Sequence, residues 1–381
     1  MNKKLIALAV VGVIVGYGTA ANAVEVSGFA NIKHYIANDS AIKYKGTASE
    51  YNSKEGKFAA DAEIDVVSTV GSVTARVDVD LRLNGTGGAS AGGALDTDGD
   101  GTLTPAEIAA ASDTDTDTNG ASIEQAMFAW DLDAVTLIGG VFNNPIGYEA
   151  EDVTDMIFNY HGAVYTALDS QTKLDGDNVA GVAVAGAVGP VTLTGAFLND
   201  LGQVSEENTF ALIANYSPIA GLDLELGLAT QVGNAAVGDN TIGALNTSVG
   251  DVTNFNVVYT GVENLTLGLD YLAGDVVLDS AYDLWAGYYV GSGFSVNARF
   301  SDIDLNNADV TTLVNNVATI ATDLKAVGLP VGDSETTTIN LTYKIAKNLK
   351  AALEVSTSDV TLLSNPSTSN DLTTLKLLAT F

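Results

Sequence analysis

The sequence predicts an all-β fold, a transmembrane antiparallel β-barrel of about sixteen strands with short turns and long loops at opposite ends. Three observations support it. Apolar and polar residues alternate along many segments, short and long connections alternate between these segments, and the chain is both acidic and apolar. Its formal net charge is −31, yet 46% of its residues are hydrophobic. Disordered acidic chains lack that apolar content, so these residues need an apolar surface to contact.

The N-terminus predicts a secretory signal peptide over residues 1–23. Lys3 and Lys4 precede an apolar run at 5–15, and the tripeptide 21–23 reads ANA, a small-residue cleavage site. The mature barrel is therefore expected to span 24–381. The chain contains no cysteine, so disulfides are not expected to contribute to its stability.

Segment 72–83 is the clearest alternating strand, because Val77 and Leu81 fall on one face while Arg76 and Asp78 fall on the other. Similar strands are expected at 222–230, 265–271, 294–300, 338–346, 349–357 and 372–381. Weaker examples lie at 24–37, 57–69, 122–132, 135–142, 179–188, 190–198, 208–216, 252–260 and 281–290. Most are near the ~9–11 residues that a tilted strand needs to cross a bilayer.

The connections alternate in length. Short turns are expected near 71, 133–134, 189–190, 218–221, 262–264, 291–293 and 347–348. Longer polar stretches lie between them, at 38–56, 84–121, 143–178, 199–207, 232–251, 274–280, 303–335 and 358–370. Lipid then provides the apolar surroundings, and closure of the sheet removes its free edges.

The last strand points to a known family. Phe381 ends the chain, with Ala379, Leu377 and Leu375 on the same face. This pattern resembles Gram-negative outer-membrane porins, and the segment GGVFNNPIGYE at 139–149 is similar to one in OmpL-like, 16-stranded porins. The resemblance implies an integral protein of the cell outer membrane that contacts lipid and lipopolysaccharide. It also implies recognition of Phe381 by the outer-membrane assembly machinery, and a homotrimer.

In porins of this type a long external loop folds inward and narrows a water-filled channel. Here that loop would be 143–178, the third long stretch. Its candidate acids are Glu149, Glu151, Asp152 and Asp155, and the strand bases expected opposite them include Arg76, Arg82 and Arg299. The resemblance implies passive diffusion of small hydrophilic solutes, and the excess of acids predicts a preference for cations. The alternative is that these acids are solvated on the outer surface.

Residues 96–107 read DTDGDGTLTPAE, the spacing of an EF-hand calcium loop, within the second long loop 84–121. The expected Ca²⁺ ligands are Asp96, Asp98, Asp100, Thr102 through its carbonyl, and Glu107. A weaker set follows at Asp113, Asp115, Asp117 and Asn119. The glycine-rich segment 84–95 is unlike an entering helix, so only half an EF-hand is present. Bound Ca²⁺ would order the loop without performing chemistry; a solvated acidic loop is the alternative.

Other classes of function have weaker support. Nucleic acid is not an expected partner, because phosphate contacts require Lys and Arg. Neither His34 nor His161 lies in a nucleophile motif, so an enzyme is not expected. The principal alternative is a calcium-dependent surface or adhesion protein with an occluded barrel. An outer-membrane hydrolase is a third possibility, for which His34 is the single strand histidine.

Overall fold

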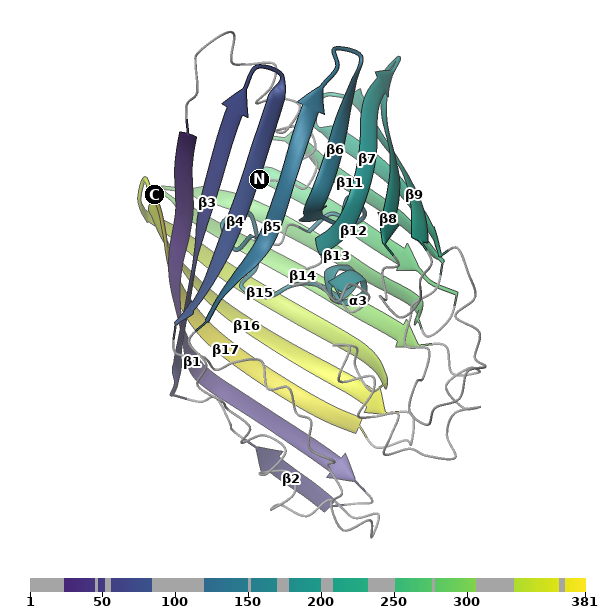
Figure 1. Cartoon of the computed structure of the whole chain (residues 1–381). Helices are drawn as coiled ribbons and strands as arrows, with labels where there is room; N and C mark the ends of the chain where they lie inside the picture. The colour runs from purple at the N-terminus through teal and green to yellow at the C-terminus, as the bar shows by residue number, and fades with distance from the viewer. Residues whose placement is uncertain are drawn as a thin grey trace.

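The computed structural model describes residues 24–44, 47–51, 56–83, 120–149, 152–169, 178–199, 208–231, 251–275, 278–305, 332–362 and 367–381. These residues form an antiparallel sheet of 17 strands, closed by pairing of β1 (Val24–Tyr44) with β17 (Ser367–Thr380). Strands β2 (Thr47–Tyr51) and β3 (Phe58–Val70) both pair with β1, each with a different part of it. The two together therefore occupy the position of a single strand in the wall. The result is a closed barrel of 16 strands (Figure 1), which confirms the predicted fold class.

The remaining strands pair with their neighbours in chain order around the wall. They are β4 (Val73–Leu83), β5 (Gly120–Asp131), β6 (Val135–Asn143), β7 (Asn178–Val188), β8 (Val191–Asn199), β9 (Asn208–Ile219), β10 (Leu222–Gln231), β11 (Val252–Val262), β12 (Leu265–Ala273), β13 (Leu278–Gly291), β14 (Phe294–Leu305), β15 (Gly332–Ala346) and β16 (Leu349–Leu362). One short helix, α3 (Ala163–Asp169), lies between β6 and β7 in the chain. Among the described residues, no helix has the length and apolar character needed to cross a membrane.

The strands carry polar side chains inward and apolar side chains outward, the reverse of a water-soluble barrel. On β11, Asn254 and Asn256 are fully buried, while Phe255 between them is 40% exposed. On β14, Asn297 and Arg299 are buried and Val296 is exposed. Exposing an apolar side chain and burying an amide are both unfavourable in water, but lipid outside the wall removes the first cost.

Exposed aromatic side chains gather near both ends of the strands. Near the short turns they include Trp130, Tyr216, Tyr288, Tyr289, Phe294 and Tyr343. Phe294 and Tyr343 stack with ring centroids 4.3 Å apart. At the opposite end, Phe197 and Phe210 pack 4.9 Å apart. Such belts mark the two lipid–water interfaces of a membrane barrel.

The short turns lie where the sequence predicts them. Gly71, Asp133 and Asn264 adopt positive φ angles of 62°, 64° and 63°, which tight hairpin turns require. One difference occurs at the start of the chain, where the stretch 38–56 was expected to be a loop. Strand β1 instead continues to Tyr44 and pairs with both β2 and β17, so strand pairing satisfies the backbone groups there.

Candidate functional site

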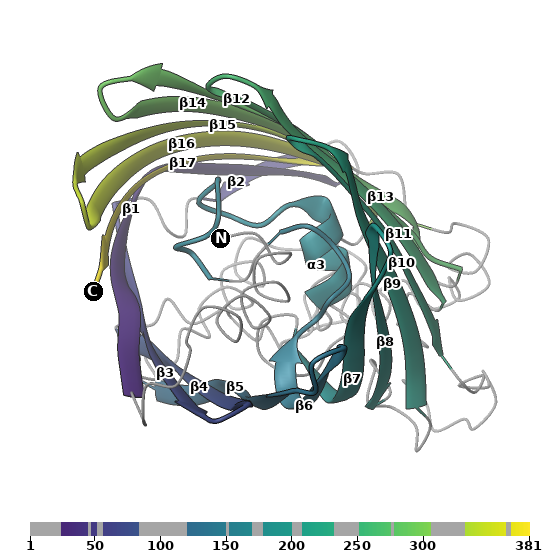
Figure 2. The ribbon, with the colours of Figure 1, turned by 90° about the horizontal axis from the view of Figure 1, so that it is seen from above.

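Residues 144–149 and 152–169, here called the inner loop, lie inside the barrel, and α3 belongs to this loop (Figure 2). The helix contacts β12, β13 and β14. Its buried Val164 and Leu168 belong to one apolar cluster with Phe142 of β6 and Ile213 of β9. The apolar part of the lumen wall therefore holds the helix, while charged side chains bind the rest of the loop.

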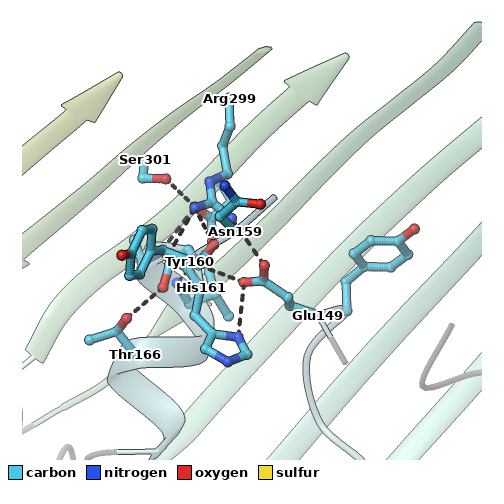
Figure 3. A network of polar contacts seen from close by, with 12 residues as sticks. Glu149, Asn159, Tyr160, His161, Thr166, Arg299 and Ser301 are labelled. Atoms are coloured by element: carbon cyan, nitrogen blue, oxygen red, sulfur yellow. Dashed lines mark hydrogen bonds and ion pairs between the residues drawn. The ribbon is translucent and has the colours of Figure 1, made fainter. Parts of the chain in front are cut away.

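The first polar attachment is centred on Arg299 of β14, which is 5% exposed (Figure 3). Its Nη1 donates a hydrogen bond to Oε1 of Glu149 at 3.0 Å. Its Nη2 donates to the carbonyl oxygens of Tyr160 at 2.8 Å and His161 at 2.9 Å. The guanidinium carbon also lies 4.4 Å from the centre of the Phe158 ring. One wall arginine thus joins Glu149 to the backbone at 160–161 of the inner loop.

A wall carboxylate caps the N-terminus of α3. The first residues of a helix have backbone N–H groups without partners inside the helix. Here the amides of Ala163 and Val164 donate to the two carboxylate oxygens of Asp283 on β13, at 3.0 and 2.9 Å. The Gly162 amide donates to Oε2 of Glu149 at 2.5 Å, and the Ser301 hydroxyl donates to Asp283, also at 2.5 Å. Asp283 therefore fixes the position of a helix too short to be stable alone.

Two more wall carboxylates accept backbone hydrogen bonds from the inner loop. The Asn159 amide donates to Oε2 of Glu354 on β16 at 2.6 Å. At the other end of the loop, the Tyr148 amide donates to Oδ2 of Asp270 on β12 at 2.7 Å. Each carboxylate also accepts from a buried wall asparagine, Asn340 and Asn254 respectively. The loop is thus attached at several widely separated strands.

Arg76 of β4 contacts three acids, one on its own strand, one on the neighbouring β3 and one on the inner loop. Its Nε lies 2.6 Å from Oδ2 of Asp78, and its Nη2 lies 3.4 Å from Oδ1 of Asp65. The same Nη2 lies 3.7 Å from Oδ2 of Asp152. Burial raises the pKa of Asp152 above its ordinary value, although the charge of Arg76 acts in the opposite direction.

A group of lysines lies beside this acidic region. Lys33 of β1 stands directly opposite Lys376 of β17, and Lys350 projects from β16. Lys350 donates to the Thr154 carbonyl at 3.4 Å, while Nζ of Lys33 lies 5.3 Å from the Tyr160 ring centre. The inner loop therefore passes over both negatively and positively charged parts of the wall.

The structure brings some of the sequence-derived candidates together. Glu149 meets Arg299, and Asp152 lies near Arg76. Asp155 follows in the same loop, where its amide donates to the Asp152 carbonyl at 2.9 Å. Arg82 instead stands across from Asp61 on the neighbouring strand.

The other candidates are outside the described residues. They are Glu151, the calcium-loop positions Asp96, Asp98, Asp100, Thr102 and Glu107, and the weaker set Asp113, Asp115, Asp117 and Asn119. Among described residues, acidic groups close enough to hold a metal ion occur elsewhere, around Glu63 on the inner wall.

Sequence reasoning did not foresee that wall acids would bind the loop. Alternation places Asp270, Asp283 and Glu354 on the lumen face, but it does not indicate that they accept hydrogen bonds from the loop. One signal was available on β5, where Glu124 and Gln125 are consecutive polar residues in an otherwise alternating strand. Both are buried, so the alternation is broken at that point.

No protein-family model matches this chain, and no curated protein sequence matches it. Solved structures do match. The outer-membrane channel DcaP of Acinetobacter baumannii is 10% identical, with 96% of this chain and 99% of that chain covered and a TM-score of 0.57. A triple mutant of the Rhodopseudomonas blastica porin is 15% identical, with 94% and 100% covered and a TM-score of 0.49. The likeness to DcaP is one of barrel fold. The apolar outer face and the polar lumen face are those of an integral membrane barrel.

Proposed function

We propose that this chain is a porin, a water-filled channel through which small hydrophilic solutes cross the outer membrane by passive diffusion. The observation that carries the proposal is the inner loop, which a set of buried wall charges attaches inside a barrel with a polar lumen face. A loop attached in this way would narrow the channel without closing it. We expect the functional assembly to be a homotrimer.

The proposed channel prefers cations. Among the described residues, the buried Asp, Glu, Lys and Arg side chains are mainly acids: Glu63, Asp78, Glu124, Asp152, Glu225, Asp270, Asp283, Asp302 and Glu354, against Arg299 and Lys376. A lumen with this balance has a negative potential, which raises the local concentration of cations and lowers that of anions. Glu149 and Asp152 would belong to the narrowest part, together with Arg76 and Arg299.

The external loop 84–121 is proposed to bind Ca²⁺ through residues 96–107. The support is the match of Asp96, Asp98, Asp100 and Glu107 to the ligand positions of a calcium loop. Affinity on the order of 10⁻⁴–10⁻³ M is sufficient for a module outside the cell. The ion would order an acidic, glycine-flanked segment and would not take part in catalysis.

The decisive experiment is single-channel recording of the refolded protein in planar bilayers, first with Ca²⁺ and then with a chelator. Stable ohmic steps and a reversal potential of cation sign in a KCl gradient are expected. A change on chelation that is absent in the variant Glu107→Gln would assign the calcium effect to the external loop. A reversal potential of anion sign would contradict the proposed selectivity.

The packing of α3 favours a second candidate, a calcium-dependent surface or adhesion protein. Residues Ala163, Val164, Tyr165, Ala167 and Leu168 are all buried inside the barrel, so the inner loop fills part of the lumen. An occluded barrel would give no conductance steps with or without Ca²⁺. That result would replace the channel proposal with this one.

A further inference from the structure

Three buried carboxylates converge where the inner loop meets the wall. Glu63 comes from β3, Glu124 from β5 and Asp152 from the inner loop, and they are 2%, 3% and 8% exposed. One carboxylate oxygen from each lies within 4.8 Å of the other two. Glu63 forms a second such group with Asp65 and Asp78. We call these five residues the wall–loop acid cluster.

The strand register explains why the cluster forms. Asp65 stands opposite Asp78, and Asp78 stands opposite Gln125 on the next strand, so the three share the lumen face. The register then shifts, because Val79 pairs with Ile123 and leaves Glu124 as an extra residue on β5. Such a bulge redirects side chains. Here it leaves Glu124 and Gln125 both buried, although neighbours in a regular strand point to opposite faces.

The charges of the cluster are far from balanced. Arg76 contacts Asp65, Asp78 and Asp152. With all five carboxyl groups ionised, the cluster and its one guanidinium would carry a formal charge of −4. Burial of an ionised group without a counter-charge is unfavourable, because the group loses its hydration and gains no attraction in return. A cation within the cluster would remove most of that cost.

Unbonded polar atoms are an independent observation at the same place. Within the described part of the chain, Oδ1 of Asp152 has no hydrogen-bond partner, although the residue is more than nine-tenths buried. Gln125 is fully buried, and neither its Oε1 nor its Nε2 has a partner. A buried polar atom of this kind is unfavourable, because it has lost its hydrogen bonds to water and made none in their place. Native structures normally satisfy such atoms, with an ion or water where no protein group is available.

We propose that Glu63, Glu124 and Asp152 bind a hard divalent cation, Ca²⁺ or Mg²⁺, that ties the inner loop to the barrel wall. The spacing of the oxygens fits such an ion. Ca²⁺ binds oxygen at about 2.3–2.6 Å, so two ligands of one ion can be up to roughly 5 Å apart. Gln125 adds a neutral amide beside the acids. Carboxylate and amide oxygens are the ligands that these two ions prefer.

This site is separate from the proposed external calcium loop and goes beyond the proposed channel function. It lies on the inner wall and uses no residue of 84–121. Its consequence is that divalent cations stabilise the attached position of the inner loop. The ion would also lower the negative charge of the cluster by two, because it is divalent.

Calorimetric titration of the full chain tests the site directly. The protein is refolded in detergent, stripped with EDTA, and titrated with CaCl₂ and separately with MgCl₂. All variants carry a background that disables the external loop, composed of D98N, D100N, E107Q, D115N and D117N. In this background we expect one remaining divalent site per chain. Absence of binding of both ions would overturn the proposal.

Matched variants locate the site. E124Q and D152N should each raise the Kd about tenfold or more, because affinity depends on the number of charged ligands. The control is E225Q, which neutralises another buried lumen carboxylate that is bonded to Asn256 instead. Equal weakening by E124Q and E225Q would refute the assignment to the cluster. Asp152 lies outside the wall strands, so D152N keeps the test valid if E124Q does not fold.

A second readout tests the connection to the loop. Hydrogen exchange of the 152–156 amides should slow when Ca²⁺ or Mg²⁺ is added to the same background protein, and D152N should abolish that effect. Binding without any change in exchange would contradict the role in loop attachment. Neither measurement needs ion conduction, so failure of this proposal and failure of the channel proposal remain distinguishable.

Discussion

Replacing Arg299 by Met should loosen the inner loop without opening the barrel wall. The substitution removes the donors to Glu149, Tyr160 and His161 but keeps an unbranched side chain of similar length against Phe158. It also leaves the Glu149 carboxylate without its counter-charge. Removal of one partner from a buried ion pair costs about 3–5 kcal/mol. Because the Glu149 side chain is 14% exposed, we take the lower end, about 3 kcal/mol.

That energy has a measurable consequence, since about 1.4 kcal/mol corresponds to a factor of ten. Exchange of the amides in 158–166 through local opening should accelerate about a hundredfold. Hydrogen exchange with peptide-level mass spectrometry of the refolded protein measures this rate. Heat-dependent migration on a denaturing gel confirms that the wall strands remain assembled.

The double variant E149Q/R299M is the matched control. It removes both charges of the Glu149–Arg299 pair and leaves neither unpaired, so its exchange rate should fall between those of R299M and the wild type. The pairwise coupling between the two residues follows from the double-mutant cycle with E149Q. If R299M exchanges within twofold of the wild type, the Arg299 network does not hold the loop, and our reasoning about its attachment is wrong.

Three further predictions concern other parts of the barrel. Asp283→Ala removes the cap of α3 at a cost of about 1–2 kcal/mol, so the Ala163 amide should exchange roughly tenfold faster; unchanged exchange would contradict the capping role. Phe255→Arg places a charge on the lipid face and should destabilise bilayer-refolded protein by about 2–4 kcal/mol near the midplane, whereas Thr253→Ala should have little effect. Lys376→Met removes a lumen base and should shift the reversal potential further toward cations, and a shift toward anions would refute the electrostatic reasoning.

The candidate site was only partly predictable. The sequence places Arg299 on the polar face of its strand, because period-two alternation is a local property, but it leaves two positions open for Glu149 and Asp152, in the lumen or solvated on the outer surface. It does not indicate which charge meets which. Glu149 and Arg299 are 150 residues apart in the chain, and Asn159 and Glu354 are 195 apart. Such pairs depend on how far each strand is staggered around the closed wall.

The bulge on β5 shows the same limit at a smaller scale. Adjacent polar residues at Glu124 and Gln125 indicate that the alternation is interrupted, but they do not indicate which face of the sheet each side chain takes. Only the pairing of Asp78 with Gln125 and of Val79 with Ile123 places both side chains inside. Asp152 then reaches the same point from a different segment of the chain. The wall–loop acid cluster therefore exists only once the barrel has closed around the loop.

The sequence by itself determined the antiparallel barrel, its lipid-facing surface and its short turns, because alternation, strand length and turn residues act between near neighbours. Tertiary structure decided the path of the inner loop, the partners of Arg299 and Asp283, and the convergence of Glu63 and Glu124 with Asp152. The physical reason is that the charges beneath the inner loop are buried where the loop packs against the wall. Each must find a partner within the barrel, and that partner is set by closure rather than by sequence distance.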